Sequence, residues 1–146
     1  KIIGFKKDKI ISFDFPVRSF SKYRQEILDK LYKLNIKLKP DLVLCHSRFD
    51  THQDHNTITN EAIRAFKKTS ILGYELPWNN FNFKAELYVE LSEKIVSKKC
   101  LALSSYKSRS HRPYLQKKRL VEIMGMRGLQ IEKNYAEAFE VIRLIK

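Results

Sequence analysis

Apolar residues recur along this chain with two different periods, and these periods predict an alternation of strands and helices. Residues 9–15 alternate apolar and polar side chains, which is the pattern of a strand. From Ser21 onward, apolar residues step by three or four, so we expect an amphipathic helix that ends before Pro40. The apolar run from Leu42 to Cys45 then indicates a short, buried parallel strand.

The same alternation continues beyond this strand. Helical spacing of apolar residues predicts a helix over about 56–68, and the apolar run 71–76 predicts the next strand. Residues 87–91 alternate as a strand, and Ser92 is a good N-cap for a helix that extends to about Lys107. Strands and helices that follow one another in this way indicate an α/β fold.

The last third of the chain has a less regular pattern. Residues 108–112 interrupt the helical spacing, and Pro113 can open a further helix. Two glycines bracket Arg127, which predicts a turn at this point. The segment 135–145 is compatible with either a helix or a strand, since its apolar residues fit both periods.

Composition is consistent with one globular domain that spans residues 1–146. The chain is 43% hydrophobic and 31% charged, which excludes a disordered profile. No apolar run approaches the roughly 18 residues that a membrane span requires, and a cytoplasmic protein is the default expectation. Cys45 and Cys100 lie far apart, each within an apolar pattern, and we expect buried free thiols rather than a disulfide.

The net charge of +13 raises the question of a nucleic-acid partner. The basic residues are 20 Lys and 9 Arg, and they are scattered along the chain, mostly in pairs. This distribution favours solvated faces over a nucleic-acid groove. An anionic partner or substrate stays open as an alternative.

Candidate chemistry is concentrated in the loop that follows the strand 42–45. Three of the four histidines lie there with two carboxylates: His46, Asp50, His52, Asp54 and His55. Open α/β sheets bind ligands at the carboxyl ends of their strands. Imidazole is a common metal ligand and proton carrier, and an adjacent Asp can orient it. The pattern indicates a metal or acid–base site; a polar loop without chemical function is the alternative.

The number of ligands in this loop is too small for a complete metal site. A catalytic zinc ion takes three protein ligands and one open position. His55 can supply one ligand, and either His52 or His46 can supply another, but no third ligand is evident. His46 and Asp50 are candidates to line a substrate site, with a structural role as the equal alternative. The sequence thus indicates part of a metal site.

Two further features are candidate contacts for a substrate. The segment 78–84 reads WNNFNFK and is either a surface loop or a lip of a binding cleft, because sugars pack well on aromatic faces. Arg127 can meet a phosphate or a sugar hydroxyl, or it can pair with a nearby carboxylate.

The stretch PDLVLCHSRFDTHQDHN resembles the second signature of the LmbE-like, or PIG-L, family of zinc-dependent N-acetylglucosaminyl deacetylases. The segments ISFDFPVRSF, ALSSYKS and RGLQIEKNYAEAF are similar to other parts of the family in the same order, so the resemblance covers nearly the whole chain. It implies a Rossmann-like three-layer α/β sandwich with a mostly parallel sheet. It also implies hydrolysis of the N-acetyl group of an amino-sugar conjugate with Zn²⁺ or another divalent metal.

The resemblance assigns a role to three residues of the loop. His55 matches the family's zinc ligand, and His52 matches the histidine that assists at the carbonyl oxygen or the leaving amine. Asp54 matches the carboxylate that orients this second histidine.

One family feature has no counterpart in this sequence. The family's other signature, His-Pro-Asp-Asp, provides two further zinc ligands and the general base. We therefore expect this chain to be the C-terminal two-thirds of the fold, without its N-terminal strands. A missing N-terminal segment, in the same polypeptide or in a partner chain, would complete the site. The alternative is an inactive remnant that binds a sugar, an anion or nucleic acid. The exposed sheet edge would need a cover, for which a homo-oligomer is one candidate.

Overall fold

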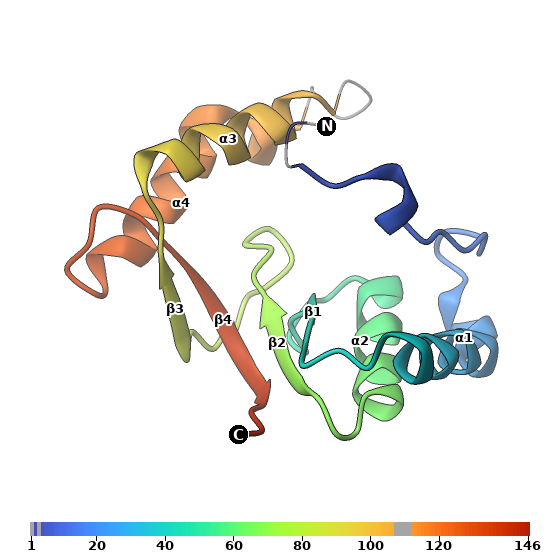
Figure 1. Ribbon diagram of the computed structural model, residues 1–146. Coiled ribbons are helices and arrows are strands. Elements are labelled where there is room, and N and C mark those ends of the chain that lie inside the picture. The colour runs from blue at the N-terminus through green and yellow to red at the C-terminus, as the bar shows by residue number, and fades with distance from the viewer. Residues whose placement is uncertain (1, 3, 107–111) are drawn as a thin grey trace. The chain divides into compact units, whose positions relative to one another are not determined.

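The chain adopts an α/β fold in the computed structural model, which describes residue 2 and residues 4–106 and 112–146 (Figure 1). Its α-helices are α1 (Arg24–Leu38), α2 (Gln53–Ala65), α3 (Glu93–Ser104) and α4 (Lys117–Leu129). Its strands are β1 (Leu42–His46), β2 (Ser70–Tyr74), β3 (Leu87–Glu90) and β4 (Ala136–Arg143). The described residues also form the short 3₁₀ helices η1 (Lys7–Lys9), η2 (Phe20–Tyr23) and η4 (Pro113–Leu115).

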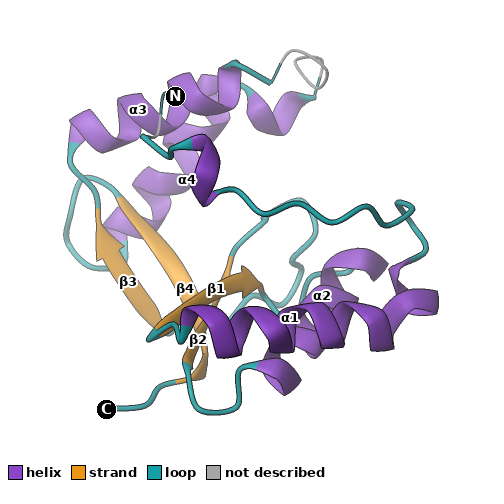
Figure 2. Cartoon of the chain, turned by 45° about the vertical axis from the view of Figure 1, so that its right-hand side comes forward, coloured by secondary structure: helices purple, strands orange, loops and turns teal. Residues whose placement is uncertain are grey.

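The strands form a mixed sheet in the order β1-β2-β4-β3 (Figure 2). β1 pairs with β2 in parallel, and β2 pairs with β4 antiparallel, with an irregularity in register between Ile71 and Leu72. The α/β prediction is confirmed, as a Rossmann-like fold whose sheet is partly parallel. No helix in the described part of the chain is long and apolar enough to cross a membrane.

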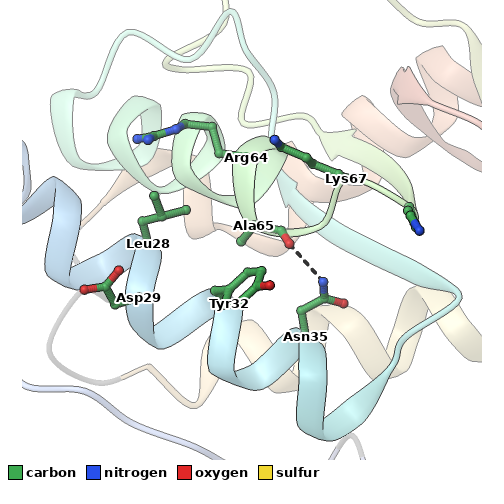
Figure 3. Close-up of a pocket in the computed structure, with 8 residues that line it drawn as sticks. Leu28, Asp29, Tyr32, Asn35, Arg64, Ala65 and Lys67 are labelled. Carbon is green, nitrogen blue, oxygen red and sulfur yellow. Dashed lines mark hydrogen bonds between the residues drawn. The ribbon is translucent and has the colours of Figure 1, made fainter.

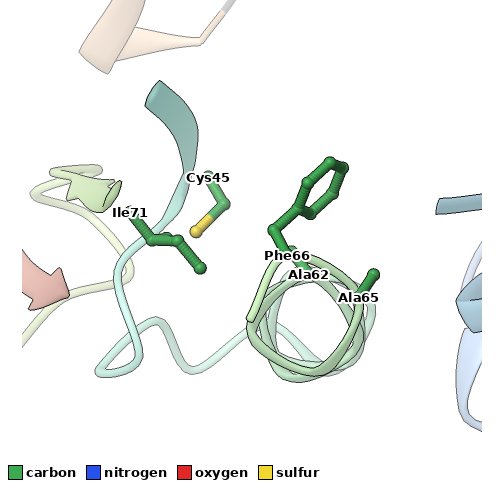
Figure 4. Close-up of a cluster of buried hydrophobic side chains, with 5 residues drawn as sticks. All are labelled: Cys45, Ala62, Ala65, Phe66 and Ile71. Atoms are coloured by element: carbon green, nitrogen blue, oxygen red, sulfur yellow. The ribbon is translucent and has the colours of Figure 1, made fainter. Parts of the chain in front are cut away.

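The chain divides into two compact units, and the first of these holds residues 14–87 and 139–146. Here α1 packs on α2, and α2 covers one face of β1. The buried side chains between them come from both helix and sheet: Cys45, Ala62, Ala65, Phe66 and Ile71 (Figure 4). Leu42 and Leu44 alternate with Cys45 along β1 and are 48% and 55% exposed. The strand predicted to be buried is therefore buried on one face only, because successive side chains point to opposite faces.

The second unit holds residues 1–13 and 88–138. Here α3 and α4 pack together over a second apolar cluster formed by Leu91, Val96, Cys100, Leu120 and Met124. The predicted cap is confirmed, since the Ser92 side chain accepts a hydrogen bond from the backbone N–H of Ile95. α3 ends at Ser104, before the predicted end at Lys107. Lys107 and residues 108–111 of the interruption predicted at 108–112 lie outside the described residues.

Most predicted elements form, and two predictions are wrong. The segment 9–15 is not a strand: η1 ends at Lys9, and the residues that follow have no regular structure. Arg127 lies in α4 rather than in a turn. Gly128 is required there by packing, since an added Cβ would come within 2.5 Å of the backbone oxygen of Lys133. The ambiguous segment 135–145 forms a strand, β4. Cys45 and Cys100 are free and buried, as predicted.

Candidate functional site

The loop between β1 and α2 brings the three predicted histidines together. The rings of His46 and His55 stack with centroids 3.8 Å apart and 12° between their planes. The rings of His52 and His55 stack with centroids 4.3 Å apart and 22° between planes. His55 therefore lies between the other two rings. This arrangement follows from the positions of the three residues in the chain. β1 ends at His46, and the start of α2 places His52 and His55 one turn apart.

His52 is the N-cap of α2, and its ring takes part in the cap. The backbone N–H of Asp54 donates to Nδ1 of His52 at 3.2 Å. The backbone N–H groups at a helix start have no partner within the helix, so a side-chain acceptor stabilises it. In the neutral imidazole one nitrogen accepts and the other carries the proton. Since Nδ1 accepts here, the proton of neutral His52 lies on Nε2.

His55 has the opposite arrangement, and Asp50 is the cause. Oδ2 of Asp50 lies 2.8 Å from Nδ1 of His55, and Oδ1 accepts from the backbone N–H of His52 at 2.8 Å. An ionised carboxylate can only accept hydrogen bonds, so Nδ1 of His55 donates. In the neutral ring, Nε2 of His55 consequently carries a lone pair. The two stacked rings thus present different groups at Nε2: an acceptor on His55 and a donor on His52.

His46 lies half-buried on the other face of His55. Its ring also contacts Tyr74, with centroids 4.8 Å apart, and its Nδ1 atom is buried without a hydrogen-bond partner. Burial, reinforced by the neighbouring His55, lowers the pKa of His46 from 6.5 to about 4. A neutral, half-buried ring supports the structural alternative for this residue.

Asp54 is implied by the resemblance to orient His52, and this role stays a prediction. Its carboxylate accepts from the backbone N–H groups of Arg18, at 2.6 Å, and Phe20, at 3.2 Å. Arg18 has a left-handed backbone with φ of 66°, and its carbonyl oxygen accepts from the side chain of Gln53. The first turn of α2 therefore holds the turn at residues 18–20. The carboxylate that contacts an imidazole is that of Asp50, at Nδ1 of His55.

Glu140 is a site residue that the sequence analysis missed. It is fully buried on β4, and its carboxylate accepts from Ser47 Oγ at 2.8 Å, Arg48 N at 2.9 Å and Arg48 Nε at 2.5 Å. Glu137, three residues earlier, instead pairs with Lys99. The available signal was the charge itself, because an acidic residue within the apolar run of a strand requires buried partners.

The aromatic segment 78–84 lies against the histidine loop. The backbone N–H of Thr51 donates to the carbonyl oxygen of Asn79 at 3.1 Å, and Asp50 forms a β-bridge with Asn80. Asn80 is buried, whereas Phe81 is exposed. The segment is thus a surface loop that also borders the site. Arg127 belongs to the other unit, where its guanidinium donates to Gln130 at 2.9 Å. Its predicted substrate contact stays a prediction.

The residues present fit one ligand position of a zinc site. A His with a carboxylate on Nδ1 and a lone pair on Nε2 is the usual form of a histidine metal ligand. Stacked rings, however, direct their in-plane lone pairs side by side rather than toward one point. In agreement, the described residues contain no group of three or more His, Cys, Asp or Glu side chains that could hold a metal ion.

A hollow of about 560 Å³ lies apart from these residues in sequence, between α1 and the end of α2 (Figure 3). Figure 3 shows Asn35 donating to the carbonyl oxygen of Ala65 across it. Its lining also includes Tyr32, Arg64 and Lys67. None of the lining residues belongs to the histidine loop.

Comparison with known proteins places the fold. No family model and no curated protein sequence matches the chain. Among solved structures, a deacetylase–teicoplanin complex matches with a TM-score of 0.68 and 18% identity, over 97% of this chain and 59% of that one. A zinc-inhibited form of teicoplanin deacetylase Orf2 matches with a TM-score of 0.66 and 18% identity, over 93% and 56%.

Proteins of other function share this fold. GalB of Pseudomonas putida KT2440, a 4-carboxy-2-hydroxymuconate hydratase, matches with a TM-score of 0.66 and 17% identity, over 95% of this chain and 64% of that one. A conserved protein from Thermus thermophilus has a TM-score of 0.68 and 20% identity, over 83% and 60%. The chain thus spans 56% to 64% of the length of these proteins. At such identities the likeness shows the fold, and one fold carries both deacetylases and a hydratase.

Proposed function

We propose that this chain carries part of the active site of an LmbE-type, metal-dependent hydrolase. The reaction would remove the N-acetyl group of an N-acetylglucosamine-type conjugate. The observation that carries the proposal is the stacked pair His52 and His55, whose Nε2 atoms are a donor and an acceptor. The deacetylases among the structural neighbours support the hydrolase class at the level of the fold, and the zinc-inhibited form of one of them supports a role for a metal.

In this proposal His55 is the metal ligand. Asp50 holds the proton of His55 on Nδ1, which leaves the Nε2 lone pair for coordination. A zinc ion bound there would polarise the amide carbonyl and supply an activated water. Asp50, a candidate substrate contact from the sequence, is in this proposal the residue that orients the metal ligand.

His52 serves the amide itself. Its Nε2–H can donate to the oxygen that becomes negatively charged, or to the leaving amine, as amide hydrolysis requires. The cap hydrogen bond from Asp54 N to His52 Nδ1 fixes the direction of the ring. The carboxylate of Asp54 contributes by joining the start of α2 to the turn at Arg18.

The remaining metal ligands and the general base come, in this proposal, from residues outside these 146, in the same polypeptide or in a partner chain. One imidazole cannot hold zinc usefully, and the described residues offer no group of three ligands. The free, buried thiols of Cys45 and Cys100 support a reducing compartment such as the cytoplasm.

The test uses the chain in its native context, purified from its host with whatever polypeptide segments or partner chains accompany it. Zinc content and acetate release from an N-acetylglucosamine conjugate are measured for the native protein, His55→Ala and His52→Ala. Asn60→Ala is the control, because Asn60 lies exposed on the same helix and its side-chain amide donates to Asn56 rather than to a candidate site residue.

His55→Ala should lose both zinc and activity. His52→Ala should keep its zinc and lose roughly 10²- to 10³-fold in kcat, as the loss of one oxyanion donor does. Asn60→Ala should retain both. Full activity in the two histidine variants would exclude the proposed roles.

A non-catalytic binding module is the second candidate, and the lack of a three-ligand group in the described part of the chain favours it. Such a module would bind a sugar or an anion, or use its net charge of +13 on nucleic acid. It predicts no metal in the native protein and, for nucleic acid, an affinity that falls steeply with salt. Lack of affinity for both sugars and nucleic acid would exclude it.

A further inference from the structure

The end of β1 is held from two strands away. Glu140 lies on β4, which pairs with β2, and β2 in turn pairs with β1. Its Oε2 atom accepts from Ser47 Oγ and Arg48 N, and its Oε1 atom accepts from Arg48 Nε. Three donors from two consecutive loop residues therefore converge on one buried carboxylate.

Gly73 on β2 makes this reach possible. A Cβ at position 73 would lie 2.8 Å from Cα of Ser47 and 3.1 Å from Oε2 of Glu140. Any other residue would force apart the loop and the carboxylate that holds it. The absence of a side chain at this one position allows β4 to contact the loop across β2.

The loop residues held by Glu140 are connected to the histidines by a short path. The backbone N–H of Asp50 donates to the carbonyl oxygen of Ser47 at 3.1 Å. Asp50 in turn contacts Nδ1 of His55 and the backbone N–H of His52. A shift of the Ser47–Arg48 turn would therefore move the carboxylate that orients His55.

We propose that Glu140 is a positioning residue, which fixes the turn at Ser47 and Arg48 and thereby sets the Asp50–His55 contact. A catalytic effect of Glu140 rests on the proposed function. Its effect on the turn and on the Asp50–His55 contact does not depend on activity. A buried carboxylate is costly unless every oxygen is paired. Here the pairing partners are residues of the site loop, so the hydrogen bonds that offset this cost also fix the loop.

Glu61 provides a matched control within the same unit. It is also fully buried, and its carboxylate accepts from Arg24 Nε at 2.7 Å and Arg64 Nη1 at 2.6 Å. It joins α1 to α2 and contacts no residue of the histidine loop by these bonds. Loss of Glu61 should therefore reduce stability without changing the histidines.

The experiment compares Glu140→Gln and Glu61→Gln in ¹⁵N-labelled chain at a single pH. Thermal unfolding reports stability, and long-range ¹H–¹⁵N imidazole spectra report which ring nitrogen of His55 carries the proton. In Glu140→Gln the amide NH₂ would face a donor from Arg48 or Ser47, so the turn must shift. We expect both variants to unfold at lower temperature and only Glu140→Gln to lose the Nδ1–H form of His55.

Should Glu140→Gln fail to fold, Ser47→Ala removes one of the three bonds and gives the same comparison. An unchanged His55 spectrum in the folded Glu140 or Ser47 variant would overturn the proposal and leave Glu140 a purely structural residue. Because the spectra need no substrate or metal, failure of this proposal is distinguishable from failure of the proposed function. In an active preparation, Glu140→Gln should also lower kcat about tenfold or more, as loss of an outer-shell partner does.

Discussion

Oδ2 of Asp50 lies 2.8 Å from Nδ1 of His55, and this contact determines which nitrogen of His55 is available to another group. Asp50 is only 3% exposed, so water competes little for its oxygens. Its second oxygen accepts from the backbone N–H of His52. One carboxylate thus joins the loop, the helix start and the predicted metal ligand.

Replacement of Asp50 by Asn should disturb His55 directly. The Asn amide nitrogen is a donor, and a donor facing Nδ1 favours the ring form with its proton on Nε2. We expect both the zinc affinity and kcat/KM of Asp50→Asn to be about 10- to 100-fold lower than those of the native protein. Asp29→Asn is the control, since Asp29 is an exposed carboxylate on α1 that accepts from Gln25. Unchanged zinc affinity and activity in Asp50→Asn would contradict the orienting role.

The Asp54 carboxylate gives a different prediction, because its partners are backbone amides. Hydrogen bonds to a charged group contribute about 1.5–3 kcal/mol, and Asp54 accepts two, from Arg18 and Phe20. Asp54→Asn should loosen this turn and speed tryptic cleavage after Arg18 about tenfold or more, relative to other sites. A changed His52 imidazole spectrum with an unchanged cleavage rate would instead support the orientation of His52 by Asp54.

Two glycines allow a matched test of the packing around Glu140. Gly73→Ala should destabilise the chain by about 1–3 kcal/mol, because its Cβ would meet the backbone of Ser47. Gly125→Ala, in α4, meets nothing within 4 Å and should stabilise the chain by about 0.5–1 kcal/mol. Urea denaturation midpoints measure both. Equal midpoints for the two variants would contradict the close approach at Gly73.

Burial of the Cys45 thiol should make the folded chain less stable at alkaline pH. Burial raises the pKa of this thiol from 9.0 to about 11, so the folded chain favours the neutral thiol. The resulting stabilisation is complete below pH 9 and is lost as pH rises through about 11. Between pH 8 and 10.5 the urea midpoint should fall more steeply in the native sequence than in Cys45→Ala. Burial also raises the pKa of Tyr74 to about 12, with a smaller contribution from the neighbouring Cys45, so most of this effect is common to both proteins. Parallel pH profiles would contradict this assignment.

Local periodicity was sufficient for the elements that carry their own apolar face. The sequence predicts α1 and α2 to within a few residues, because apolar residues spaced by three or four form the faces on which these helices pack. The segment 9–15 has a strand pattern but forms none, since a strand also requires a partner that periodicity does not supply. For β4 the reverse holds: its pattern was ambiguous, and pairing with β2 decides it.

The site was predictable where its parts are close in sequence. The grouping of His52 and His55 followed from their spacing of three at a helix start. The sequence did not indicate which carboxylate contacts an imidazole, since Asp50 and Asp54 both lie near His55 in the chain. The path of the loop decides it, because it directs Asp50 to His55 and Asp54 to the backbone of Arg18. Glu140 acts on a turn 92 residues away, and such a contact depends on strand order rather than on local pattern.

The most direct test of the account is the long-range ¹H–¹⁵N imidazole spectrum of the native chain at a pH where both rings are neutral. Neutral His55 should carry its proton on Nδ1, which leaves Nε2 as the acceptor. Neutral His52 should carry its proton on Nε2, because Nδ1 accepts from the helix start. Opposite tautomers in the two stacked histidines would support His55 as the metal ligand and His52 as the hydrogen-bond donor. The same Nε2–H form in both would contradict the account.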